Sequence, residues 1–244
     1  MPTIKLILFT FFTILFTVIL PSSIARLFSE NKLIKELLES IIPLLFFLIY
    51  TYRNRKNLLN FQPTLIYRKT LWTLLIIPLF IAFLKNPITN FELNTFFYVL
   101  MISTTIGITE ELIFRGILFR KFQKSKFPVY LLISAILFGV LHYNQGVIGI
   151  ISATIGGLIY GLSRISGFPL LLLIICHSAT DFPMMWMKYG NHPEEVIKNT
   201  TLSGIINLSS ILFFLIVLFI VIKFLFKTEH WTNEFNKITT GNTV

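Results

Sequence analysis

Charged residues are scarce in this sequence. They make up 13% of the 244 residues, whereas a typical soluble domain carries about 25%. Hydrophobic residues make up 55% of the chain, and the mean hydropathy is +0.77. So little charge does not cover a water-facing surface, and the apolar stretches are too many for a soluble domain with one anchor. The composition therefore predicts an integral membrane protein.

Cysteine and acidic residues are also few. Cys176 is the single cysteine, which excludes an internal disulfide and any metal site built from several cysteines. Asp and Glu number 11 against 21 Lys and Arg, giving a formal net charge of +10. The excess basic residues lie between apolar segments, where they orient membrane helices and do not form one binding face. We therefore expect the lipid bilayer as a partner and no nucleic acid.

The apolar residues gather in eight segments that approach the length of about 20 residues needed to cross a bilayer as a helix. The predicted membrane helices are 4–20, 38–52, 70–85, 95–120, 127–143, 147–163, 168–187 and 203–226. We predict an all-α, polytopic bundle forming one integral-membrane domain over 1–244. Its core would be 95–187, and 227–244 would be a polar tail.

The basic residues predict how these helices are oriented. An even number of helices places both termini on the side that carries most Lys and Arg, which is the cytoplasmic side. Lys5 and the Ser23–Ala25 sequence also resemble a signal peptide and its cleavage site. We expect a retained helix, because cleavage would leave an odd number of helices. The expected location is the cell membrane, crossed several times.

Ionisable residues inside the apolar segments are the most informative feature, because each costs several kcal/mol in lipid and marks a functional site by default. They are Glu110, Glu111, Arg115, His142, His177 and Asp181. Glu111 and Arg115 are four residues apart, so we expect an ion pair that supports the structure. Glu110 lies about 100° further around the helix, which leaves its carboxylate free to face a cavity.

The other four ionisable residues are expected to converge. Glu110 and His142 lie at equal distances along the chain from residue 126, within the polar turn 123–128, so an antiparallel hairpin places them at one depth. His177 and Asp181 are four residues apart and face one direction on their helix. We predict that the four share one pocket.

A carboxylate and an imidazole that converge on water can act as general base and then general acid in amide hydrolysis. Glu110 is suited to take the proton, while His177 and Asp181 can polarise the scissile carbonyl or hold the oxyanion. Glu110, His142 and His177 also supply two nitrogens and one oxygen, a ligand set used by catalytic zinc. The residues leave the metal-free and the zinc-dependent mechanisms open.

The polar residues fall in three motifs: EExxxR at 110–115, FxxxH at 138–142 and HxxxD at 177–181. Their order, spacing and placement on three apolar helices resemble the CPBP family of intramembrane endopeptidases. This family includes the CAAX proteases and the bacteriocin-processing enzymes, also called Abi proteins. The resemblance covers about 95–187 and implies an endopeptidase that may or may not need a metal ion.

By that resemblance, Glu110 and His142 activate the water, and His177 with residue 181 stabilises the oxyanion. Many relatives have asparagine where this chain has Asp181, and an ionised aspartate cannot donate a hydrogen bond. Three roles stay open for Asp181: a protonated donor, a group that orients His177, or part of a metal site.

The substrate is expected to be a peptide or membrane protein, with a role in bacteriocin processing or self-immunity. Two other function classes stay open. Buried Glu, His and Asp residues also form the proton relays of coupled transporters, although the chain has no repeated half with paired broken helices. A non-catalytic membrane immunity or scaffold protein would keep the polar residues for packing alone.

Overall fold

The computed structural model describes residues 68–86, 88, 91–119 and 127–190, with a few isolated positions between 45 and 52 and between 212 and 219. Every regular element in these ranges is helical, and they contain no strand. The elements are α4 (Arg68–Lys85), α5 (Leu93–Glu111), the π-helix η2 (Leu112–Leu118), α7 (Phe127–Leu141), the 3₁₀ turn η4 (Tyr143–Gln145), α8 (Gly146–Ile165) and α9 (Leu170–Tyr189). The predicted all-α class is confirmed for this part of the chain.

Five of the eight predicted membrane helices lie in the described ranges, and each matches an observed helix to within a few residues. Three helical segments there are long and apolar enough to cross a membrane: Leu93–Leu118, α8 and α9. α4 and α7 contain shorter apolar stretches, Leu75–Leu84 and Val129–Leu141. The predicted helices 4–20, 38–52 and 203–226 and the polar tail lie outside the described residues, so the number of membrane crossings and the side of the termini stay predictions.

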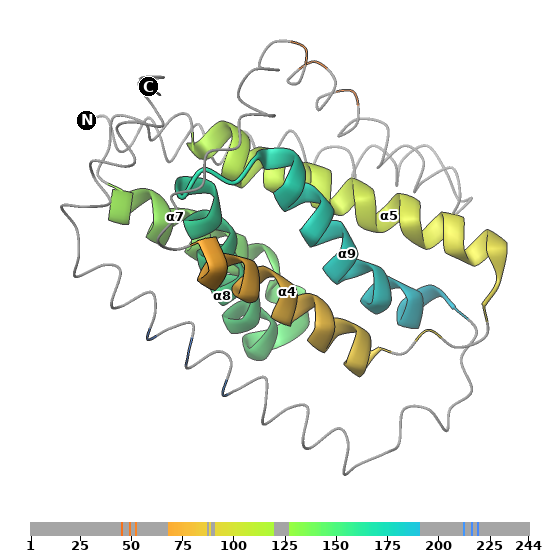
Figure 1. The fold of residues 1–244 in the computed structure, drawn as a ribbon. Coiled ribbons are helices and arrows are strands. Elements are labelled where there is room, and N and C mark those ends of the chain that lie inside the picture. Colours follow the sequence, from red (N-terminus) through yellow and green to blue (C-terminus); the bar gives the residue numbers. More distant parts are fainter. Residues whose placement is uncertain are drawn as a thin grey trace.

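The helices pack in pairs, with α5 against α9 and α7 against α8, while α4 contacts both α9 and α8 (Figure 1). Small residues let the paired backbones approach. A Cβ added to Gly107 on α5 would lie 3.0 Å from the Ser178 backbone nitrogen on α9, and one added to Gly157 on α8 would lie 2.9 Å from Ala135 Cα on α7. The first contact joins α5, where the EExxxR motif begins, to α9, which carries HxxxD. The second joins α7, which carries Phe138, to α8.

The bundle exposes large apolar side chains on its outer faces, as a protein surrounded by acyl chains requires. Examples are Phe80, Phe97, Leu132, Ile148 and Ile175. The buried positions include polar and charged side chains, among them Glu111, Arg115, His177 and Asp181. Charge is therefore gathered inside the bundle, where protein groups replace water as its partners.

The segment after α5 differs from the single α-helix expected over 95–120. A π-helix begins directly after Glu111 and carries Arg115, and such segments often occur at functional sites. Side chains from other helices bond its carbonyl groups: the Tyr130 hydroxyl donates to Phe114 O at 3.0 Å, and Arg164 Nε donates to Arg115 O at 3.2 Å. These long-range hydrogen bonds favour a local geometry that helix periodicity does not encode.

Candidate active site

Arg115 and Glu111 form the buried base of the site. Both side chains are fully buried, and Arg115 Nη1 donates to Glu111 Oε1 at 2.9 Å. Arg115 Nη2 donates to the Gly157 carbonyl oxygen on α8 at 3.0 Å. The structure thus contains the ion pair expected from the four-residue spacing. The Arg115 side chain also links η2 to α8.

Aromatic rings surround the Arg115 guanidinium. Its central carbon lies 4.7 Å from the centroid of Phe138, 5.5 Å from that of Tyr160 and 5.6 Å from that of Phe114. Ring faces attract a cation, most strongly where water is excluded. Arg115 is therefore held by a carboxylate, a carbonyl and three rings, which compensates for its burial.

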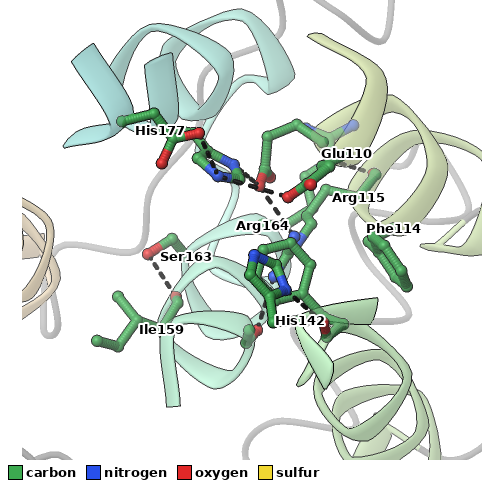
Figure 2. Close-up of polar contacts among 12 residues, drawn as sticks. Glu110, Phe114, Arg115, His142, Ile159, Ser163, Arg164 and His177 are labelled. Carbon is green, nitrogen blue, oxygen red and sulfur yellow. Dashed lines mark hydrogen bonds and ion pairs between the residues drawn. The ribbon is translucent and has the colours of Figure 1, made fainter. Parts of the chain in front are cut away.

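His177 on α9 contacts all three acidic residues of the site. Its Nδ1 lies 2.8 Å from Glu111 Oε1, while its Nε2 lies 3.6 Å from Glu110 Oε2 and 3.5 Å from Asp181 Oδ2. Figure 2 shows the imidazole directed toward Glu110. Because a carboxylate only accepts, Nδ1 donates its hydrogen to Glu111, which fixes the ring and leaves Nε2 facing the other two acids.

Sequence reasoning missed the contact between Glu111 and His177. The spacing of the EExxxR motif assigned Glu111 to Arg115 alone, yet one carboxylate can accept several hydrogen bonds. The two residues are 66 positions apart, so no local periodicity reports their contact. Glu111 thereby orients His177 as well as neutralising Arg115.

Glu110 has the more open of the two adjacent carboxylates. Its side chain is 19% exposed, against 0% for Glu111. Its Oε2 atom is buried and makes no hydrogen bond to any described residue. An acceptor without a donor, on a side chain that is still partly accessible, is a position that a water molecule can fill.

His142 follows the end of α7, and its Nδ1 lies 2.9 Å from its own helix at Phe138 O. Since a carbonyl oxygen accepts, Nδ1 carries the hydrogen, and in the neutral ring Nε2 keeps a lone pair. The Phe138 ring lies 5.0 Å from the His142 ring and 5.8 Å from the His177 ring, so both imidazoles flank one phenyl group. Figure 2 shows His142 below Glu110 and His177, on a separate helix.

Of the four residues predicted to share one pocket, three therefore lie close together and His142 lies apart from them. His177 Nε2 lies within ion-pair distance of both the Glu110 and the Asp181 carboxylates. His142 is joined to them through Phe138, and within the described residues no hydrogen bond or ion pair connects it with Glu110.

The zinc ligand set fits this arrangement poorly. Over the described ranges, no group of three His, Cys, Asp or Glu side chains is placed to hold a metal ion. Of the expected ligands Glu110, His142 and His177, the first and last meet at 3.6 Å, and His142 Nδ1 is turned to Phe138 O. We therefore derive no step through a metal ion.

Residues 92–183 match the family model of the Rce1-like type II CAAX prenyl endopeptidases. Over this segment, the family resemblance is confirmed. The segment contains all three motifs and all six ionisable residues discussed above. Comparisons with curated proteins and with solved structures gave no match.

Proposed function

We propose that this protein is an intramembrane endopeptidase of the CAAX-protease type, in which Glu110 and His142 activate water and His177 assists. The observation that carries the proposal is the partly open Glu110 carboxylate beside a histidine whose other nitrogen is held by Glu111. A hydrolase needs an acceptor for the proton of water. Glu110 and Glu111 each have an oxygen without a donor, but only the Glu110 side chain is partly accessible.

The first chemical step is the addition of water to the peptide carbonyl. Glu110 takes one proton from the water, whose oxygen forms a bond to the carbonyl carbon while the carbonyl π electrons move to oxygen. The lone pair on His142 Nε2 accepts the second hydrogen bond of the same water and orients it. His142 acts through Nε2 in this step, because its Nδ1 hydrogen is held by Phe138 O.

The negative oxygen of the intermediate needs a hydrogen-bond donor. His177 can supply one from Nε2 when that nitrogen carries a proton, as its two acidic neighbours favour. Distances of 3.5 and 3.6 Å to these acids are too long for strong hydrogen bonds, so the proton stays accessible to a substrate oxygen. Asp181 acts in this scheme by orienting His177 and stabilising its charge.

The second step breaks the carbon–nitrogen bond. The oxyanion re-forms the carbonyl, the bonding pair leaves with nitrogen, and Glu110 returns its proton to the amine. The products are a new carboxyl terminus and a new amino terminus, and Glu110 is again ionised. The biological role we propose for this reaction is bacteriocin processing or self-immunity. No observation in the described residues specifically favours a proton-coupled transporter or a non-catalytic scaffold.

The test is peptide cleavage by the full chain in proteoliposomes, with a farnesylated CAAX peptide and a membrane-protein peptide library read by mass spectrometry. We expect Glu110→Gln to lower kcat about 10³-fold and His142→Ala about 10²-fold or more, as for lost general acid–base groups. Glu92→Gln is the matched control, because Glu92 is exposed at the start of α5 and its side chain contacts Thr95. Full activity in a folded Glu110→Gln protein would refute the proposal.

A further inference from the structure

In the mechanism proposed above, the oxyanion has too few hydrogen-bond donors. When His177 Nε2 is protonated, it offers the oxyanion a single hydrogen. Asp181 lies 3.5 Å from the same nitrogen, and an ionised Asp181 has no hydrogen to donate. A hydrolase built this way needs a second, neutral donor close to His177.

Tyr160 on α8 has a hydroxyl group that the fold leaves unused. The residue is 6% exposed, and its buried hydroxyl oxygen makes no hydrogen bond within the part of the chain that the structure describes. The neighbouring Thr180 hydroxyl donates its own hydrogen to Cys176 O at 2.8 Å, which leaves its oxygen as a nearby acceptor for the Tyr160 hydroxyl in the resting protein. A buried hydroxyl without a partner is costly and rare in native proteins, so its retention calls for an explanation.

The position of Tyr160 supplies that explanation. Its ring lies 5.3 Å from the His177 ring, at an interplanar angle of 33°, and 5.5 Å from the Arg115 guanidinium carbon. The Arg115 hydrogen bond to Gly157 O fixes the same turn of α8 against η2. The phenol is thus held beside the reactive histidine by contacts that do not involve its hydroxyl.

We propose that the Tyr160 hydroxyl donates a hydrogen bond to the oxyanion of the tetrahedral intermediate and thereby supplies the neutral donor that an ionised Asp181 cannot be. This inference rests on the proposed endopeptidase function. Tyr160 keeps its proton throughout: it stabilises the charge that develops on the substrate oxygen and exchanges no atom or electron. A donor that is positioned before the reaction, with at most a weak contact to Thr180, has little to give up when that charge appears.

The test compares Tyr160→Phe with wild type in the proteoliposome cleavage assay. The substitution removes the hydroxyl and keeps the ring against His177 and Arg115. We expect kcat to fall about 10²-fold, as for other lost oxyanion donors, with KM changed less than about twofold, since the bond forms in the transition state. Because the hydroxyl makes no close hydrogen bond within the described residues, the Tm should change little.

Two further variants separate this role from a structural one. Tyr130→Phe removes another buried phenol hydroxyl, one that bonds Phe114 O at 3.0 Å, so it should lower the Tm with a smaller effect on kcat. Thr180→Val should leave kcat within about threefold of wild type. A kcat for Tyr160→Phe within twofold of wild type would overturn the inference, as would a loss of Tm in Tyr160→Phe that Thr180→Val reproduces.

The same assay distinguishes failure of this inference from failure of the proposed function. Normal cleavage by Tyr160→Phe, together with lost cleavage by Glu110→Gln, would overturn only the role of Tyr160. Cleavage that persists in Glu110→Gln, or no cleavage of any probe by wild type, would overturn the endopeptidase proposal and the role of Tyr160 with it.

Discussion

Glu111 serves two partners through a single oxygen atom. Its Oε1 lies 2.9 Å from Arg115 Nη1 and 2.8 Å from His177 Nδ1. Its carboxylate therefore neutralises a buried guanidinium and fixes the orientation of a histidine in the proposed site. Removing either neighbour leaves buried charge without its partner, which is far more costly than losing an exposed ion pair.

Arg115→Ala should destabilise the protein by about 3–5 kcal/mol, because it leaves the fully buried Glu111 without its cation. Thermal unfolding in detergent measures the effect, with a lower purified yield as a second sign. Lys188→Ala is the control: Lys188 is exposed near the end of α9, so its removal should change the Tm little. Equal stability of the two variants would contradict the structural role of the Arg115 pair.

At the residue scale, the sequence could predict contacts within one helix. Glu111 with Arg115, and His177 with Asp181, are each four residues apart, and both pairs meet in the structure. The contact of Glu111 with His177 depends on how α5 packs against α9, which local spacing does not specify. The contact of the Tyr160 ring with the His177 ring was missed for the same reason.

At the scale of elements, the contact of α7 with α8 depends on a glycine that has no room for a side chain. A Cβ on Gly157 would approach Ala135 Cα to 2.9 Å, and a Cβ on Gly161 would approach Leu131 Cδ1 to 2.8 Å. The Gly157 carbonyl also accepts the Arg115 hydrogen bond. Helix packing and the base of the site therefore share one residue.

Replacing either of two adjacent glycines by alanine should change the stability of the protein in opposite directions. Gly157→Ala should destabilise the protein by about 1–3 kcal/mol, because the new methyl group meets backbone on α7. Gly156→Ala should stabilise it by about 0.5–1 kcal/mol, since a Cβ there has open space and alanine favours a helix interior. Thermal unfolding of both variants checks the pair. A destabilised Gly156→Ala protein, or an unaffected Gly157→Ala protein, would contradict this packing.

The helices themselves could be predicted well from hydropathy, because lipid demands long apolar segments whatever their tertiary contacts. The π-helix could not. Leu112–Leu118 is as apolar as the residues before it, and its distinct geometry goes with hydrogen bonds from Tyr130 and Arg164 on other helices. Sequence periodicity reports which face of a helix is apolar and contains no signal for such distant donors.

At the scale of the whole molecule, the described helices present apolar side chains outward and enclose a polar cluster that reaches from α5 to α9. A protease inside a membrane needs this arrangement, since its water and its charges must be kept from acyl chains. From the distribution of basic residues we propose that the segment between η2 and α7 faces the cytoplasm and that the segment after α9 faces the opposite side.

Cysteine labelling tests this orientation. In a Cys176→Ser background, Ser125→Cys should react with a membrane-impermeant maleimide only after the cells are opened. Asn191→Cys should react in intact cells. The reverse pattern, or equal labelling of both positions, would refute the proposed orientation while leaving the helix packing untouched.

The most direct test of the central claim is peptide hydrolysis in water enriched in ¹⁸O, read by mass spectrometry of the products. If Glu110 activates water, wild type should place one ¹⁸O atom in each new carboxyl terminus, and Glu110→Gln should form about 10³-fold less labelled product in the same time. Labelled product at the wild-type rate from a folded Glu110→Gln protein would contradict the account.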